Sequence, residues 1–314
     1  MYLNAFAQDA EPLDMTKSDE FQSLLASASD LGIKHPATVR YVSRNVLVNG
    51  LRLHLTEWGD PAHQALLLLH GGNQTSHSWD LVSLHLSDRF HIIALDQRGH
   101  GDSEWPRDGQ ATPVDMATDA AAVIAALNLR NPIVMGHSMG GIVTMSLLRD
   151  FPGVAQKAVL VDVAPELSPE GTRVIQDFIR GIGEFDSADE FVDRVVSYDP
   201  FRTRDHVQRT VRYNLLRRAD GKYVSKHDLA HRVLQGRVQS SIAERPTLDD
   251  AARFNLPVLL VRGQESNVLT TESAERFVAR LPQGRLVTVE RCAHNVHSQN
   301  TLGFLEAVVP FLTE

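Results

Sequence analysis

The chain has 314 residues, of which 43% are apolar and 22% charged, and this composition excludes a long disordered protein. Its formal net charge is −8, so we expect no broad surface for nucleic acid, which requires clustered excess Lys and Arg. The single cysteine, Cys292, excludes an intrachain disulfide bond. The chain is longer than most single domains, which have roughly 100–200 residues.

The apolar runs of this sequence are short. The run at residues 65–69 is typical of a strand, whereas a membrane span requires about 20 apolar residues. The first twenty residues contain neither the basic nor the apolar region of a signal peptide. We therefore expect a cytoplasmic protein without a membrane partner. The sequence does not decide the oligomeric state and leaves a homo-oligomer open.

Residues 1–36 form an acidic arm with six acidic residues against two lysines. Apolar residues within it follow a helical spacing, at Phe21, Leu24, Leu25, Ala28 and Leu31, and Thr16 or Ser18 precedes them as an N-cap. The pattern predicts one short amphipathic helix. This helix either packs on the rest of the protein or binds a partner.

A β-hairpin is predicted next, because alternating apolar residues flank Asn49-Gly50, a pair typical of two-residue turns. Short, nearly all-apolar runs follow at residues 65–69, 92–95, 133–135, 158–161, 258–261 and 286–289. Helical segments lie between several of them, for example at residues 118–127 and 141–149. Strands that are apolar on both faces are typical of a parallel sheet covered by helices on both sides. The fold class predicted is α/β, with a doubly wound, mostly parallel sheet.

The strand pattern stops after Val163, and residues 165–249 show helical periodicity with little strand signal. It resumes at residues 256–258. We therefore divide the chain into the arm (1–36), a core (37–164 and 250–314) and an inserted helical cap (165–249). A cap inserted at the end of a strand is well placed to cover a site at the carboxyl edge of the sheet.

A nucleophile motif, G-x-S-x-G, occupies residues 136–140 as Gly-His-Ser-Met-Gly. It follows an apolar strand and precedes a helical segment, which is the setting of a nucleophile elbow. Small residues are required because the turn is tight and the helix passes close to the strand. Ser138 would then lie at a helix N-terminus, where free backbone N–H groups stabilise a developing oxyanion.

With this motif, the sequence resembles the α/β-hydrolase superfamily over nearly all of residues 40–314 except the cap. Three further segments carry the resemblance: HGG at 70–72, DQRGHGDS at 96–103 and AHNV at 293–296. The stretches HGGNQTSHSW and DQRGHGDSEW are most similar to cofactor-free esterases, enol-lactonases and phthalate-monoester hydrolases. In such relatives, the Arg and Asp of the second segment brace the site and do not react.

The resemblance implies roles for several residues. Ser138 is the nucleophile, and His294 is the general base, with His297 as the second choice. The backbone N–H groups of Met139 and Gly72 hold the oxyanion, and Gly71 and Asn73 belong to the same loop. No metal or cofactor is implied; a metal pair formed by His294 and His297 has no supporting ligand motif.

The acid of the triad departs from the family pattern. Relatives keep an Asp where this chain has Asn267, and an amide cannot stabilise an imidazolium as a carboxylate does. Asp162, directly after the strand at 158–161, is the preferred alternative. Glu265, in the usual loop, is a second. The third is that Asn267 only orients the histidine, in which case the enzyme is slow.

Three functions fit these residues. The first is hydrolysis of a carboxylic ester or lactone through an acyl-enzyme, with a small-molecule substrate. The second is carbon–carbon bond hydrolysis of ring-cleavage diketones by the same side chains. The third is a non-catalytic ligand-binding protein, to which the loss of the usual acid gives slight support.

The charge of the predicted cap is uneven. Residues 165–201 hold nine acids and three bases, and residues 202–237 hold ten bases and three acids. The two halves either pair with each other on the surface, or one arginine binds a substrate carboxylate. The arginines considered for that role are Arg202, Arg204, Arg212, Arg217 and Arg218.

Overall fold

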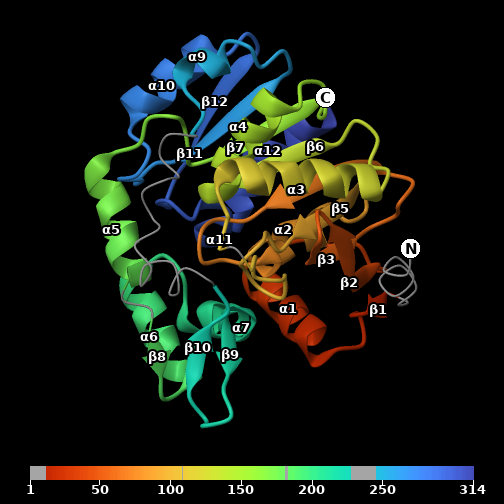
Figure 1. Cartoon of the computed structure of the whole chain (residues 1–314). Helices are drawn as coiled ribbons and strands as arrows, with labels where there is room; N and C mark the ends of the chain where they lie inside the picture. Colours follow the sequence, from red (N-terminus) through yellow and green to blue (C-terminus); the bar gives the residue numbers. More distant parts are fainter. Residues whose placement is uncertain (1–11, 108, 181–182, 228–244) are drawn as a thin grey trace.

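The computed structural model describes residues 12–107, 109–180, 183–227 and 245–314, and a mostly parallel sheet runs through its centre (Figure 1). The strand order is β1-β2-β3-β5-β4-β6-β7-β11-β12. The strands are β1 (Leu13–Asp14), β2 (Tyr41–Val48), β3 (Leu51–Trp58), β4 (Gln64–Leu69), β5 (Phe90–Leu95), β6 (Ile133–His137), β7 (Lys157–Val161), β11 (Val258–Gly263) and β12 (Gly284–Val289). From β5 to β12 neighbouring strands are parallel, whereas β1, β2 and β3 pair antiparallel, as does β3 with β5. The predicted fold class is confirmed.

The predicted hairpin is the pair β2–β3. Its turn residues Asn49 and Gly50 have φ values of 50° and 75°, the positive values that a two-residue turn requires. All eight residues of β2 pair with β3, from Tyr41 opposite Trp58 to Val48 opposite Leu51. The turn chemistry therefore fixes the register of this edge of the sheet.

Helices cover both faces of the sheet, and two buried clusters of apolar side chains hold them there. The first face carries α3 (Pro113–Ala126), α4 (Met139–Asp150), α9 (Leu248–Ala251) and α10 (Thr271–Arg280). The second face carries α1 (Asp19–Asp30), η1 (Ser76–Trp79), α2 (Asp80–Leu86), α11 (Val296–Gln299) and α12 (Thr301–Thr313). Successive residues of β4 alternate between the two clusters, which explains why that strand is apolar throughout.

Between β7 and β11 the chain leaves the sheet and forms a separate layer (Figure 1). Its elements are α5 (Pro169–Arg180), β8 (Glu184–Phe185), α6 (Ala188–Tyr198), α7 (Arg204–Asn214), β9 (Leu215–Arg217) and β10 (Tyr223–Ser225). The three strands form a small antiparallel sheet over a cluster that includes Phe185, Phe191 and Val207. We keep the name cap for residues 165–249, of which 181–182 and 228–244 lie outside the described residues.

The strands of the cap correct the expectation of an essentially helical insertion. Each is only two or three residues long. Alternation of apolar and polar residues needs at least four residues to be recognised. The periodicity of the sequence therefore could not predict the small sheet.

The helix expected in the arm is α1. It begins after Ser18, whose Oγ accepts a hydrogen bond from the backbone N–H of Phe21 at 3.1 Å, so Ser18 is the N-cap. Phe21, Leu24 and Ala28 are buried in the same cluster as Tyr41 and Trp58. The helix therefore packs on the body of the protein, as one of the two interpretations predicted. Residues 1–11 of the arm lie outside the described residues.

Among the described residues, no helix combines the length and the apolarity that crossing a bilayer requires.

Candidate active site

Ser138 stands in the sharp turn between β6 and α4, with a φ of 50° and a ψ of −115°. A side chain in this region is strained, and such strain is typical of a nucleophile elbow. Glycines on either side allow the tight crossing: a Cβ added at Gly136 would lie 2.2 Å from the carbonyl oxygen of Gly140, and one at Gly140 would lie 2.2 Å from that of Leu69. The motif therefore has the strand–turn–helix geometry that its sequence predicted.

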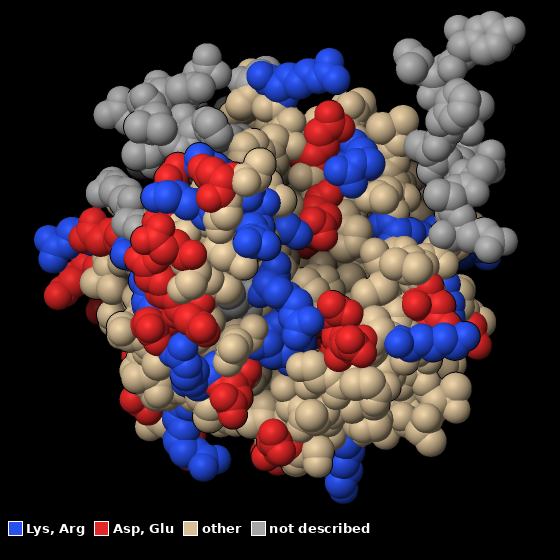
Figure 2. Space-filling model, turned by 90° about the horizontal axis from the view of Figure 1, so that it is seen from below, with Lys and Arg blue, Asp and Glu red and all other residues tan. Residues whose placement is uncertain are grey.

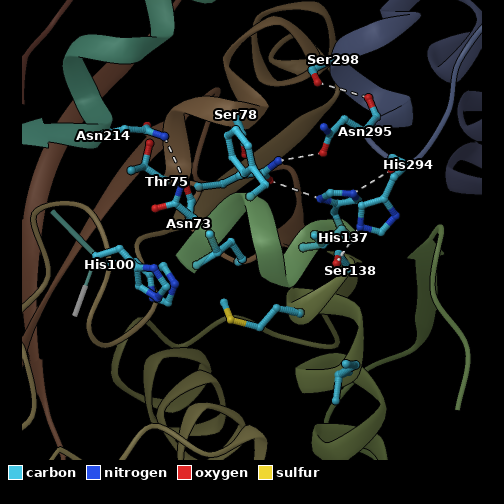
Figure 3. A pocket seen from close by; sticks show the side chains of 18 of the residues that line it. Asn73, Thr75, Ser78, His100, His137, Ser138, Asn214, His294, Asn295 and Ser298 are labelled. Atoms are coloured by element: carbon cyan, nitrogen blue, oxygen red, sulfur yellow. Dashed lines mark hydrogen bonds between the residues drawn. The ribbon is translucent and has the colours of Figure 1, made fainter. Parts of the chain in front are cut away.

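Ser138, His294 and Asp162 form one hydrogen-bonded chain. The Oγ of Ser138 lies 2.9 Å from Nε2 of His294, and Nδ1 of His294 lies 2.8 Å from Oδ2 of Asp162. Figure 3 shows Ser138 and His294 together at one side of a cavity. The three residues come from the ends of β6 and β7 and from the segment after β12, so parallel strands bring them to one edge of the sheet.

Asp162 is held firmly in this position. It is fully buried, it has a φ of 53°, and it follows β7 directly. Its Oδ1 accepts a hydrogen bond from the backbone N–H of Gly263 at 3.0 Å, and its Oδ2 accepts one from Oγ of Ser266. These donors fix the carboxylate and satisfy it in an otherwise dry environment.

The other two acid candidates lie elsewhere. Asn267 and Glu265 are both exposed, and neither contacts His294 in the described part of the chain. Both ring nitrogens of His294 are already occupied, one by Ser138 and one by Asp162. The geometry therefore brings Asp162, and not the residue at the family's usual position, to the histidine.

The backbone N–H groups predicted to bind the oxyanion differ in whether they already have a hydrogen-bond partner. Met139 is the first residue of α4, so its backbone N–H has no partner within the helix. Among the described residues, none accepts a hydrogen bond from the N–H of Gly72. The N–H of Gly71, in contrast, donates to Oε1 of Gln74 at 3.0 Å. Met139 and Gly72 both line the cavity, and Gly71 does not.

Asn73 connects the oxyanion loop with the cap. Its carbonyl oxygen accepts a hydrogen bond from Nδ2 of Asn214 at 3.0 Å, and its side-chain oxygen accepts one from Oγ of Ser225 at 3.2 Å. The first of these contacts is drawn in Figure 3. Asn73 therefore positions the loop against α7 and β10, which sequence reasoning did not foresee.

Several further histidines around the site are held neutral. Burial lowers the pKa of His70, whose Nε2 accepts a hydrogen bond from the backbone N–H of Gln97. Burial, followed by the neighbouring His297 and His294, holds the pKa of His137 well below its usual range. His137 Nε2 lies 2.9 Å from the carbonyl oxygen of His294, so this ring braces the segment that carries the base.

His297 has a different environment from His294. Its ring stacks on Trp79 with the centroids 4.1 Å apart, and neither of its nitrogens has a hydrogen-bond partner among the described residues. Burial and the nearby Arg202 lower its pKa to about 3. His294 therefore fits the role of base, because it alone of the two contacts Ser138.

The segment at 96–103 braces the core. Asp96 accepts hydrogen bonds from the backbone N–H groups of Ser76 and Asp102 and contacts Nδ1 of His54 at 2.8 Å. The ligand atoms of His54, Asp96 and Asp102 lie within 4.8 Å of one another. The hydrogen bonds of His54 and Asp96 give these two buried side chains a structural role. Arg98 binds Asp119 through two hydrogen bonds, at 2.6 and 2.7 Å.

The cavity above Ser138 has a volume of about 1010 Å³ and lies between core and cap. Its core side includes Gly72, Ser138 and His294. Its cap side includes Phe178 and Tyr198, whose rings stack with centroids 4.1 Å apart, together with arginines described below. A volume of this size accommodates a small organic molecule.

Comparison with known proteins identifies the family. Residues 64–301 match the family described as alpha/beta hydrolase fold. The chain is 29% identical over 303 residues to an esterase of Mycobacterium tuberculosis, Rv0045c, covering 94% of this chain and 96% of that protein. It is 25% identical over 288 residues to a 2-(acetamidomethylene)succinate hydrolase of Mesorhizobium japonicum, covering 91% and 98%.

A crystal structure of the same mycobacterial esterase superposes with a TM-score of 0.75 at 27% identity, covering 95% of this chain and 99% of the other. The match therefore includes the cap as well as the sheet. The chain belongs to the alpha/beta hydrolase family, and it is a hydrolase.

Proposed function

We propose that this protein hydrolyses a carboxylic ester or lactone through an acyl-enzyme on Ser138. The observation that carries the proposal is the hydrogen-bonded chain from Ser138 Oγ through His294 to Asp162, at 2.9 and 2.8 Å. A serine hydroxyl is a weak nucleophile until a base accepts its proton, and this chain supplies the base and the carboxylate that orients it. The relatives described as an esterase and a hydrolase support the same reaction class.

In the proposed reaction, Ser138 Oγ attacks the carbonyl carbon while His294 Nε2 takes the hydroxyl proton. Asp162 stabilises the resulting imidazolium through Nδ1. The N–H groups of Met139 and Gly72 donate to the oxygen that becomes negative. The tetrahedral intermediate then collapses, its C–O bond breaks, and His294 returns the proton to the leaving alcohol.

Deacylation repeats these steps with water. His294 takes a proton from a water molecule, which attacks the acyl carbon, and the carboxylic acid leaves as Ser138 regains its proton. All of these steps use side chains and backbone groups of this chain.

A screen of p-nitrophenyl esters of increasing acyl length, together with lactones, tests the proposal. We expect hydrolysis by the wild type and a loss of roughly 10⁴-fold or more in kcat for Ser138→Ala. A vinylogous diketone in the same screen tests carbon–carbon hydrolysis. The proposal is wrong if the folded wild type cleaves no ester or lactone, or if Ser138→Ala retains the activity.

A further inference from the structure

The charged residues of the cavity wall are almost all basic. Among the described residues that line it, Asp199 is the one acid, whereas the arginines are Arg98, Arg202, Arg209 and Arg245. Arg98 is neutralised by its paired hydrogen bonds to Asp119. The remaining three arginines belong to the cap, so the cap side of the cavity carries the excess positive charge.

Arg209 is the most deeply buried of these cations. It is 5% exposed and lies on α7, where its Nη1 contacts Oδ2 of Asp80 at 3.1 Å. Its Nε has no hydrogen-bond partner in the described part of the protein. A buried N–H without a partner is costly. Arg209 lines the cavity, so a ligand there would be bound through its Nη groups.

Arg202 is paired only weakly. Its Nε lies 3.4 Å from Oδ2 of Asp199, too far and too poorly aligned for a hydrogen bond in this arrangement. Asp199 already accepts hydrogen bonds from Nε2 of Gln299 at 2.7 Å and from Nδ2 of Asn295 at 3.3 Å. Asp199 thus shares its charge among several donors, whereas Nη1 and Nη2 of Arg202, which lines the cavity, donate to none of the described residues.

The pKa values of two buried histidines are lowered by burial and by these cations. Burial and the nearby arginines lower the pKa of His206 and of His297 to about 3, so both rings are neutral near pH 7. His206 precedes Arg209 by one turn of α7, and both line the cavity. No acidic side chain besides Asp199 and Asp80 contacts Arg202 or Arg209 within the described ranges.

The basic group also lies close to the triad. The ring of His297 is 4.7 Å from that of His137, which is 4.9 Å from that of His294. After burial, the positive charge of Arg202 is the main cause that lowers the pKa of His297. Arg202 and Arg209 line the same cavity as Ser138 and His294.

The exposed arginines of the cap, unlike those in the cavity, form ion pairs with acidic side chains. Arg204 pairs with Asp189 and Asp193, Arg218 pairs with Glu184 and Asp220, and Arg212 pairs with Glu20 of α1. Figure 2, seen from below the view of Figure 1, shows this pattern of basic side chains interspersed with acidic ones. Charge neutralisation thus holds on the outer surface and is incomplete within the cavity.

We propose that Arg202 and Arg209 bind a carboxylate group of the substrate, so that this hydrolase prefers esters that carry a free carboxylate. The proposal rests on the function proposed above and names its substrate class. A planar guanidinium donates two parallel hydrogen bonds to a carboxylate, and such charge-assisted pairs are stronger than neutral ones. A monoester of a dicarboxylic acid would place its ester on Ser138 and its free acid on the arginines.

The test compares two substrates with the same scissile bond: the mono-p-nitrophenyl ester of glutaric acid and its neutral methyl p-nitrophenyl diester. We expect the wild type to prefer the monoester by about tenfold or more in kcat/KM. Arg202→Gln and Arg209→Gln should each lower the ratio of kcat/KM for the monoester to that for the diester about tenfold. Arg212→Gln, on the surface, is the matched control and should change neither.

Loss of Arg209 leaves Asp80 buried without its cation, so far-UV circular dichroism checks that each variant is folded, and Arg202→Gln, which keeps that pair, decides the proposal. Equal kcat/KM values for the two substrates in the wild type, or equal losses on both substrates in the Arg202 variant, would overturn the carboxylate site. Calorimetry with glutarate gives a readout without catalysis, and Arg202→Gln should weaken its binding about tenfold. Tighter binding of inorganic phosphate than of glutarate would also overturn the proposal. Hydrolysis of neither ester with intact glutarate binding would contradict only the proposed function.

Discussion

The core wall and the cap wall of the cavity differ in how completely their polar groups are hydrogen-bonded. On the core wall, Ser138, His294 and Asp162 form a continuous chain of hydrogen bonds, and both Ser138 and Asp162 have a positive φ. On the cap wall, Arg209 is buried and Arg202 is partly buried, and the Nε of each lacks a partner among the described residues. The first arrangement is complete without a ligand and suits a reaction common to a family. The second is completed by a ligand and suits the selection of a substrate.

The largest expected effect sharpens the core side of this comparison. Asp162→Asn should lower kcat about 10⁴-fold, because an amide cannot stabilise the imidazolium or fix the tautomer of His294. Asn267→Asp and Glu265→Gln are matched controls in the neighbouring loop, and each should stay within about twofold of the wild type, since both side chains are exposed and away from His294. Steady-state kinetics with a p-nitrophenyl ester measures all three. Full activity in Asp162→Asn would remove this residue from the triad.

A second change tests how tightly the core wall is packed. Gly140→Ala should destabilise the protein by roughly 3 kcal/mol, because the new Cβ would lie 2.2 Å from the backbone oxygen of Leu69. Gly72→Ala is the control for stability, since no atom lies within 4 Å of a Cβ added there. Urea unfolding measures both free energies. Equal stabilities of the two variants would show that the elbow tolerates a methyl group.

A third prediction concerns His297, which lines the cavity, and the dependence of the free energy of unfolding on pH. The pKa of His297 is about 3 in the folded protein, below the ordinary value of 6.5. As the pH falls below 6.5, His297 becomes protonated in the unfolded chain but stays neutral in the folded protein. The contribution of His297 to stability is therefore complete above pH 6.5 and is lost as the pH falls toward 3. His297→Gln should make the fall in unfolding free energy shallower by up to about 1.4 kcal/mol per pH unit.

Urea unfolding at several values between pH 5 and pH 8 measures this slope. His63→Gln, at an exposed histidine, is the control and should leave the slope unchanged. An identical slope for wild type and His297→Gln would contradict the buried, neutral state of this ring.

The smallest effect is expected on the outer surface of the cap. Arg212 and Glu20 form an ion pair at 3.2 Å, with side chains 43% and 33% exposed. Glu20→Gln should lower the unfolding free energy by less than about 0.5 kcal/mol, because exposed pairs are screened by water. A thermal melt measures it. A loss of several degrees would mean that this pair holds α1 and the cap together, unlike the other surface pairs.

The sequence was most informative where the chemistry needs short, contiguous motifs. The elbow at 136–140, the sheet and the hairpin at Asn49-Gly50 were all predictable, because glycines and apolar runs report local backbone geometry directly. The acid was not decided in the same way. Asp162, Glu265 and Asn267 all follow strands, and only the folded structure shows that the side chain after β7, Asp162, is the one that reaches His294.

The cap was harder to predict for a related reason. Its strands are too short to give a periodic signal. Arg202 was among the arginines considered, but Arg209 was not, and the orientation of α7 that buries it depends on packing against Asp80 in a distant segment. Tertiary contacts of this kind leave no local pattern in the sequence.

The rate at which a fluorophosphonate probe labels Ser138 tests the central claim most directly, because labelling needs the activated hydroxyl and no particular substrate. The account predicts a single adduct, located by peptide mass spectrometry on Ser138, with labelling slowed at least about 100-fold in Asp162→Asn and unchanged in Asn267→Ala. No adduct on Ser138 in the folded wild type, or equal rates in wild type and Asp162→Asn, would contradict it.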